Sequence, residues 1–376
     1  MLKLPDKITA TTFLEEYWQE RPLFMPQAMP RLRPAVTRNE LAWLATHDDV
    51  ESRIVFVERS GTSRRYCAEN GPFDAAFLQQ LPKRDWTLLV HDVEKHIPAM
   101  RGLFDAIPFV PDWRIDDLMV SFAAPGGGVG PHRDNYDVFL CQGIGVRNWH
   151  ISNTDIAADP LASDDLALLN EFAGNEYDAV QGDVLYLPPG VAHWGTATRA
   201  CLTYSIGMRA PEAADFAHAL QSATPDVPAF YSDPDLQLRE ASPGRISRAS
   251  VQRALALMQA PPHRAPEVAL ALGQFATQNK DWLRPEGVAP DEIGSVLDRL
   301  IAGAAIRLHG MAQIAFDDQH LFVNGETFEM SDADRQLVAR LCAERRLRRS
   351  GRRDSARSGL LAFLLAHGAF EIPENS

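Results

Sequence analysis

The chain has 376 residues, 45% of them hydrophobic, with 37 basic and 50 acidic side chains and a formal net charge of −13. This length exceeds what one hydrophobic core usually supports, and the hydrophobic content excludes a disordered polypeptide, so we expect two or three globular domains. The acidic balance disfavours direct nucleic-acid binding as the main activity and favours basic partners.

The amino terminus and the cysteines indicate a cytoplasmic protein. Residues 1–6 lack the apolar segment of a secretion signal, and no apolar run is long enough to cross a bilayer. The four cysteines are scattered and contain no C-x-x-C pair, so neither a zinc site nor a disulfide framework is predicted. We therefore expect a cytoplasmic location and no membrane association.

The first 210 residues predict a short helix followed by an antiparallel double-stranded barrel. The helix is expected around residues 12–19, before a proline-containing extension. Short apolar runs then alternate with turn residues, and the predicted strands are 54–57, 87–90, 119–122, 138–140, 184–187 and 202–205. Helical insertions are expected at 99–104 and 163–172, the second with Ser163 as its N-cap. The glycines at 126–128 predict a mobile loop at the mouth of a site.

The pair His132 and Asp134, with His193 about sixty residues later, carries the main chemical signal. On an extended strand, side chains at i and i+2 share a face, so His132 and Asp134 can reach one metal while Arg133 points away. His193 follows a Gly-Asp turn, an apolar run and a Pro-Pro-Gly bend. Two histidines and one carboxylate are the ligand set of non-haem Fe(II). The H-x-D pattern alone is more often a surface histidine beside a solvated aspartate, but the combination favours a metal site.

Arg147 lies in a predicted strand, where it would share one face with Trp149 and Ile151. A guanidinium among such apolar groups requires an anion. A dicarboxylic cosubstrate such as 2-oxoglutarate would supply a carboxylate for a bidentate pair, beside a metal-bound keto acid. The alternative is an internal salt bridge with an acidic side chain. His150 alternates to the opposite face, where we expect a packed or solvated side chain.

The composition changes after residue 211. Helical patterns at 213–221 and 245–259 flank a proline-containing linker at 225–234. The last hundred residues resemble a winged helix, with helices near 290–302 and 331–343 and a hairpin that turns at Asn324-Gly325. The arginine-rich run 345–353 lacks interleaved aromatics, so a solvated face, or a docking surface for ribosomal protein or RNA in passing, is favoured over nucleic-acid binding as its role. The predicted domains are 1–211, 212–272 and 273–376.

Several motifs together resemble the JmjC-type, cupin-fold ribosomal oxygenases, and most closely the bacterial protein-arginine hydroxylases. The matching segments are 13–18 with 21–23, 130–134 with 136–139, Gln142-Gly143 with Arg147, and 182–193. They span most of the first two hundred residues, and the remaining length also fits that family. The resemblance implies an α+β chain: a double-stranded β-helix (cupin/JmjC jelly-roll) barrel, a helical domain and a C-terminal winged-helix domain.

The resemblance also implies the ligands of the site. Fe(II) would be held by His132, Asp134 and His193, with 2-oxoglutarate and O2 as cosubstrates and Arg147 as the basic residue that holds 2-oxoglutarate. Related eukaryotic proteins have lysine at the Arg147 position, so the arginine points to the bacterial branch. The family places a small polar residue near the cosubstrate, and Ser121 matches it by position.

Three further residues are weaker candidates for the site. Tyr204, on a late strand, is a second candidate for cosubstrate binding, although barrel packing is the alternative for both Tyr204 and Ser121. A substrate guanidinium needs acidic or aromatic partners at the mouth. Tyr136 and Asp137 follow the metal pair directly, and we interpret them as candidates for binding the substrate.

The implied reaction is hydroxylation of the β-carbon of an arginine in large-subunit ribosomal protein number sixteen. The resemblance further implies a homodimer formed through residues 212–272, with an intramolecular helical spacer as the alternative. Three other functions stay open: a histidyl hydroxylase of another ribosomal protein, a protein lysine demethylase, and a non-catalytic metal-binding scaffold.

Overall fold

The computed structural model describes residues 2–32, 36–61, 63–220, 228–259, 264–301, 305–348 and 355–371. The chain divides into two compact units: the first contains Met1–Ile107 and Asp116–Met208, and the second contains Pro108–Ile115 and Arg209–Ser376. None of the helices in these described ranges has the length and apolarity needed to span a bilayer.

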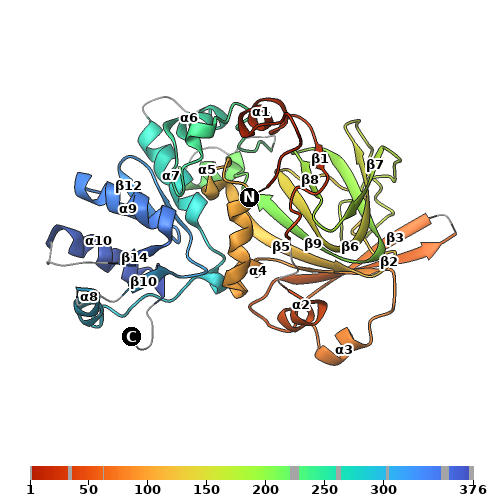
Figure 1. The fold of residues 1–376 in the computed structure, drawn as a ribbon, viewed down its shortest axis with the longest axis horizontal. Coiled ribbons are helices and arrows are strands. Elements are labelled where there is room, and N and C mark those ends of the chain that lie inside the picture. The colour runs from red at the N-terminus through yellow and green to blue at the C-terminus, as the bar shows by residue number, and fades with distance from the viewer. Residues whose placement is uncertain are drawn as a thin grey trace. The chain divides into compact units, whose positions relative to one another are not determined.

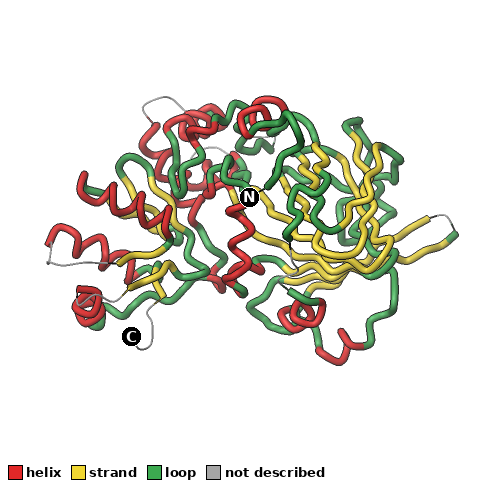
Figure 2. The backbone as a smooth tube through the Cα atoms, in the orientation of Figure 1, coloured by secondary structure: helices red, strands yellow, loops and turns green. Residues whose placement is uncertain are grey.

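The first unit is built on a nine-stranded sheet. Its strands are β1 (Leu23–Met25), β2 (Ser52–Ser60), β3 (Ser63–Asn70), β4 (Trp86–Val90), β5 (Ile115–Ala123), β6 (Val138–Ser152), β7 (Asn175–Val180), β8 (Val184–Leu187) and β9 (Ala192–Met208). The spatial order is β1-β8-β6-β9-β5-β4-β2-β3, and β7 pairs with β6. The sheet folds back on itself, with β6, β7 and β8 in one layer and β2 and β3 in the other (Figure 1, Figure 2). All six strands predicted from the sequence lie within this sheet, and the predicted barrel is confirmed.

The long strands β6 and β9 form the central pair. Their antiparallel register runs from Val138 opposite Gly207 to Ser152 opposite Ala192, with irregularities between Gln142 and Arg147. Such bulges bend a strand and change the aim of nearby side chains. β8, which pairs with β6, is buried along its whole length. Its continuous apolar run is therefore explained by burial on both faces.

The helices of the first unit cover the sheet and its ends. They are α1 (Ala10–Glu16), α2 (Arg38–Leu44), α3 (Ala75–Gln79), α4 (Val93–His96) and the 3-10 helix η1 (Pro98–Ala106). The predicted helices at 12–19 and 99–104 are confirmed by α1 and η1. From α1, Phe13 packs edge-on against the Tyr186 ring of β8, at 5.0 Å between ring centroids. α2 begins with a Thr37–Glu40 capping box, a signal that the sequence reading missed.

The helix predicted at 163–172 is wrong, because this segment is an irregular loop. The Ser163 hydroxyl accepts hydrogen bonds from the backbone N–H groups of Asp165 and Leu166, which forms a turn and not a helix start. Backbone hydrogen bonds across the loop occupy N–H and C=O groups that a helix would need for its own hydrogen bonds. The Asp159 N–H donates to the Leu168 oxygen, and the Asn170 N–H donates to the Ala157 oxygen.

The second unit contains six α-helices and six strands in its described part. The helices are α5 (Ala213–Ala219), α6 (Arg248–Leu257), α7 (Ala265–Thr277), α8 (Ile293–Ile301), α9 (Asp332–Glu344) and α10 (Ser355–Ala366), with 3-10 helices η2 (Asp112–Arg114), η3 (Leu238–Glu240) and η5 (Asp281–Leu283). The strands are β10 (Ala305–Leu308), β11 (Ile314–Phe316), β12 (His320–Val323), β13 (Glu326–Glu329), β14 (Arg346–Arg348) and β15 (Phe370–Glu371). They form two sheets, β14-β10-β15 and β11-β12-β13.

The predicted helices and hairpin of this unit are confirmed. Asn324 and Gly325 have φ angles of 49° and 86°, and such positive values at both central residues suit a tight hairpin turn. The predicted boundary between residues 272 and 273 falls inside the continuous helix α7. Residues 225–227 of the predicted linker and 349–353 of the arginine-rich run lie outside the described residues.

The glycines at 126–128 pack against neighbouring strands and do not line the cavity of the first unit, contrary to the predicted loop at its mouth. Gly126 donates a backbone hydrogen bond to Ala197, and Ala197 donates one to Gly127. A Cβ atom at residue 127 would lie 2.1 Å from the backbone oxygen of Trp86. Only glycine therefore fits between these backbones.

We expect Gly127→Ala to lower the free energy of unfolding by about 1 to 3 kcal/mol, because the added methyl group overlaps backbone that cannot rotate away. Gly102→Ala is the matched control, since no atom lies within 4 Å of a Cβ built there. Urea unfolding followed by circular dichroism measures both. Equal stabilities of the two variants would contradict the close packing described above.

Candidate metal centre and its cavity

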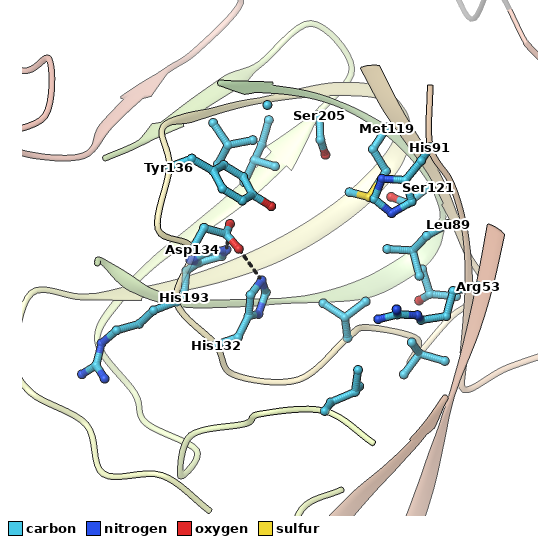
Figure 3. Close-up of a pocket in the computed structure, with 18 of the residues that line it drawn as sticks. Arg53, Leu89, His91, Met119, Ser121, His132, Asp134, Tyr136, His193 and Ser205 are labelled. Atoms are coloured by element: carbon cyan, nitrogen blue, oxygen red, sulfur yellow. Dashed lines mark ion pairs between the residues drawn. The ribbon is translucent and has the colours of Figure 1, made fainter. Parts of the chain in front are cut away.

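The structure brings together the three predicted metal ligands. One ligand atom from each of His132, Asp134 and His193 lies within 4.8 Å of the others. His132 and His193 face each other in an isolated antiparallel bridge, in which each backbone N–H donates to the other residue's oxygen, at 3.0 and 2.9 Å. The H-x-D pair lies outside the named strands, and this bridge fixes it beside the start of β9 (Figure 3).

Both imidazoles present Nε2 towards the carboxylate. Nδ1 of His132 lies 2.9 Å from the Gly130 oxygen, and Nδ1 of His193 lies 3.0 Å from the Val191 oxygen. A carbonyl only accepts, so each Nδ1 carries the proton and each Nε2 keeps a lone pair. These Nε2 atoms lie 3.9 Å (His132) and 3.6 Å (His193) from the Asp134 oxygens.

The protonation of this group suits a divalent metal. Burial, with a contribution from His132, lowers the pKa of His193 to about 4, so its imidazole is neutral at pH 7. Two neutral nitrogens and one carboxylate oxygen are the donor set that non-haem Fe(II) accepts while keeping open coordination positions. The residues present therefore fit the metal that the sequence predicts.

These ligands line a cavity of about 330 Å³ inside the first unit (Figure 3). The wall follows the period of two expected for strands, because side chains that point inwards alternate with those that point outwards. Along β5 and along β4 with its extension, the inward residues are Asp117, Met119 and Ser121, and Thr87, Leu89 and His91. Apolar side chains such as Val55, Leu140 and Leu168 complete the lining.

Arg147 lies in the wall of this cavity, on β6, as the sequence predicts. It is 5% exposed, and its Cζ lies 5.5 Å from the centroid of the Trp149 ring. Its Nε and Nη2 atoms have no hydrogen-bond partner in the described part of the chain. Ser121 also lines the cavity, and its buried hydroxyl likewise has no hydrogen-bond partner among the described residues. Unpaired buried donors of this kind are costly, so they indicate a site for an anion.

Tyr204 does not line the cavity. Its side chain is fully buried, and its ring packs beside Gly143, where an added Cβ would lie 2.5 Å from Tyr204 Cε2. The neighbouring residues Ser205 and Gly207 do line the cavity. Because residues alternate along β9, Tyr204 belongs to the opposite face, and the prediction that it binds the cosubstrate is not supported.

Asp137 is also outside the cavity lining. Its carboxylate is fully buried and accepts hydrogen bonds from the Tyr186 hydroxyl at 2.6 Å and from Gln19 Nε2 at 2.7 Å. These bonds attach the amino-terminal segment to β8 and to the segment that precedes β6. Asp137 therefore has a structural role in the barrel, and its prediction as a substrate contact is corrected.

Tyr136, predicted to contact the substrate, lines the cavity, and beside it lie Asp117 and His91, two charged or titratable residues that were not predicted from the sequence. His91 Nδ1 lies 3.0 Å from Asp117 Oδ2. Tyr136 is partly exposed, but its hydroxyl is the buried end of the side chain, and the pKa of this hydroxyl is raised by that burial and by the negative charges of Asp134, Asp117 and Asp116. The signal available in the sequence was the strand period, because Asp117 shares a strand face with Ser121.

Models of known families match two parts of the chain: a JmjC domain over residues 102–216 and a ROXA-like winged helix over residues 265–371. The ribosomal protein uL16 3-hydroxylase of Escherichia coli is 33% identical over 327 residues, which cover 84% of either chain. A probable ribosomal oxygenase of Haemophilus influenzae is 32% identical over 249 residues, or 65% of this chain and 59% of that one.

The fold agrees with these matches. The solved structure of the ribosomal oxygenase YcfD from Escherichia coli, in complex with cobalt and 2-oxoglutarate, has a TM-score of 0.74 at 27% identity. The match covers 99% of each chain, so both units of the fold are shared. The chain belongs to the family of JmjC-domain ribosomal oxygenases.

Proposed function

We propose that the protein is an Fe(II)- and 2-oxoglutarate-dependent oxygenase that hydroxylates the β-carbon of an arginine in ribosomal protein uL16. The supporting observation is one cavity that combines His132, Asp134 and His193 with the buried, unpaired guanidinium of Arg147 and the carboxylate of Asp117. The named activity of the Escherichia coli relative supports uL16 as the substrate.

Arg147 is the residue that would hold 2-oxoglutarate. A guanidinium binds a carboxylate through two parallel N–H donors, and the Ser121 hydroxyl offers a further donor from β5. Together, bound Fe(II) and 2-oxoglutarate supply the oxidative decarboxylation that activates O2 for insertion into a C–H bond. The apolar lining, which includes Val55, Leu140 and Leu168, keeps water away from the reacting atoms.

Asp117 and Tyr136 would receive the side chain of the substrate. Asp117 and Ser121 lie four residues apart on β5, and this separates the cation site from the cosubstrate site by about 13 Å. Beside Tyr136, the carboxylates of Asp116 and Asp117, which are not metal ligands, favour a cation over a neutral imidazole. The ring of Tyr136 offers a face on which a guanidinium can stack. These features favour an arginyl hydroxylase over a histidyl hydroxylase.

The other two alternatives have less support. Methyl-lysine is typically bound by an aromatic cage. In the described lining of this cavity, Tyr136 and Trp149 are the Tyr, Trp or Phe side chains, and two such rings are fewer than a cage around an ammonium group needs. A purely structural metal would not require the unpaired Arg147 donors. Structural metals are also typically held in closed sites by four protein ligands, whereas the three ligands here line a cavity.

We further propose a cytoplasmic homodimer whose partner is the ribosomal protein and not nucleic acid. The domain division 1–211, 212–272 and 273–376 belongs to this proposal, with the second segment in the dimer contact. Partly buried apolar side chains on or next to α6 and α7 support that contact, among them Val251, Leu257, Met258 and Leu270.

Mass spectrometry tests the proposed activity. The protein is incubated with Fe(II), 2-oxoglutarate, O2 and purified uL16, and peptides are searched for a gain of one oxygen. We expect the gain on the β-carbon of one arginine, and none with His193→Ala, which removes a metal ligand. Modification of a histidine, or release of formaldehyde from a methylated lysine, would indicate one of the alternative activities. No modification of any residue would contradict the proposal.

Arg147→Met should raise the dissociation constant for 2-oxoglutarate about 100-fold, because two charge-assisted hydrogen bonds are lost. Co(II) binding should not change. The control is Arg53→Met, which removes an equal charge from the same cavity wall, at a residue whose Nε donates to Asn70. Calorimetric titration of 2-oxoglutarate into the Co(II)-loaded protein measures both variants. A similar loss in both would assign the effect to general charge and not to Arg147.

A further inference from the structure

His91 makes a direct contact with the carboxylate proposed to bind the substrate cation. Its Nδ1 lies 3.0 Å from Asp117 Oδ2, and both residues line the cavity, with side chains 33% and 17% exposed. An ionised carboxylate only accepts, so Nδ1 carries the proton and donates it to this bond. The backbone N–H of Asp92 also points to Oδ2, at 3.5 Å. Among the described residues, both hydrogen bonds to this carboxylate therefore reach Oδ2.

The segment that carries His91 is itself held in place. Directly after His91, Asp92 and Lys95 form a buried ion pair, with Lys95 Nζ 2.5 Å from Asp92 Oδ1. Glu94, on α4, accepts the backbone N–H of Leu118 at 3.0 Å. Residues 117 and 118 of β5 are thus bonded to two successive parts of this segment. Such second contacts fix the orientation of a binding group before the ligand arrives.

Gly207 leaves space on the other side of the carboxylate. A Cβ atom at this residue would lie 3.2 Å from Asp117 Oδ1 and 3.9 Å from Tyr136 Cε2. A side chain at this position would therefore crowd Oδ1 and contact the Tyr136 ring, and glycine keeps both clear of one. The φ angle of Gly207 is not in the left-handed region, so backbone conformation does not require glycine here. The absence of a side chain, and not backbone freedom, is what this position contributes to the cavity.

We propose that His91 is a positioning residue for the substrate, which holds Asp117 Oδ2 so that Oδ1 faces the guanidinium, and that Gly207 keeps the approach of this cation to Oδ1 clear of a side chain. This inference rests on the proposed arginyl hydroxylase and adds the residues that determine its preference for a cation. Without the His91 bond, the longer contact from the Asp92 N–H remains as a weaker restraint on the carboxylate, and the binding of a guanidinium would have to fix it at an entropic cost.

The test compares peptides with and without positive charge. The uL16 peptide that the protein hydroxylates is prepared with arginine, and with citrulline, its neutral isostere, at the target position. Their dissociation constants are measured with the Co(II)- and 2-oxoglutarate-loaded protein, for the wild type, His91→Leu, His91→Asn and Gly207→Ala. Gly102→Ala is the matched control for the added methyl group.

We expect His91→Leu to weaken the arginine peptide about tenfold and the citrulline peptide less than twofold, since the loss of one hydrogen bond to a charged group is of this size. His91→Asn should recover most of the arginine affinity, because its amide N–H can replace Nδ1–H. Gly207→Ala should weaken the arginine peptide about tenfold, while Gly102→Ala should have no effect. The KM of the arginine peptide should follow its affinity, with kcat changed less than twofold in His91→Leu.

Two outcomes overturn the positioning role while the proposed function stands. One is a His91→Leu protein that binds the arginine peptide as the wild type does. The other is an equal loss for both peptides that His91→Asn does not recover, which would indicate a general structural effect. If the wild type hydroxylates no arginine of uL16, the proposed function fails first, and the positioning role fails with it.

Discussion

Two backbone hydrogen bonds between His132 and His193 determine the geometry on which the site depends. They join the H-x-D segment, which is not part of a named strand, to the first residues of β9. The carbonyls of Gly130 and Val191 then fix the tautomer of each imidazole, so that both Nε2 atoms are available on the Asp134 side. A three-ligand group thus forms from segments about sixty residues apart, with His193 on β9 and the H-x-D pair held beside that strand by the bridge.

The barrel turns this group into a selective site by separating two charges. Inward residues of one strand, β5, provide Ser121 at one position and Asp117 two inward positions away. Arg147, from the opposite layer, adds an unpaired cation, whereas Asp117 and its neighbours add negative charge around Tyr136. A dicarboxylate and a cationic side chain can therefore bind at separate places in one cavity. The spacing of Asp117 and Ser121 along β5 keeps the substrate cation and the cosubstrate apart, while both stay in the cavity that contains the metal ligands.

The sequence predicted the features that depend on local spacing. The inward face of Arg147 and the Asn324-Gly325 hairpin each follow from a period or a turn preference over a few residues. The His-x-Asp pair was found by its spacing, although the structure places it outside a named strand. Two errors came from not applying the strand period. Counting in twos from Val138 or from Ser205, both in the cavity wall, shows that Asp137 and Tyr204 face away from it. Asp137 and Tyr204 were chosen for their chemical type and not for the strand face on which they lie.

Other features depend on contacts between distant segments and could not be read from local patterns. The loop 155–174 resembles a helix start at Ser163, but its backbone groups pair across the loop. The bond between His91 and Asp117 joins residues twenty-six positions apart on neighbouring strands. Likewise, the glycine at 207 matters only because Asp117 and Tyr136 lie beside it. The roles of His91 and Gly207 can be inferred only once the structure shows which strands are neighbours.

The central claim is that one cavity holds the metal, 2-oxoglutarate and a substrate arginine in fixed relative positions. A crystal structure of the protein with Co(II), 2-oxoglutarate and a uL16 peptide, with anomalous data at the cobalt edge, tests it directly. We expect one anomalous peak bonded to His132 Nε2, Asp134 and His193 Nε2, a 2-oxoglutarate carboxylate on Arg147, and the guanidinium beside Asp117 and Tyr136. Cobalt bound elsewhere, or a guanidinium that does not approach Asp117, would contradict it.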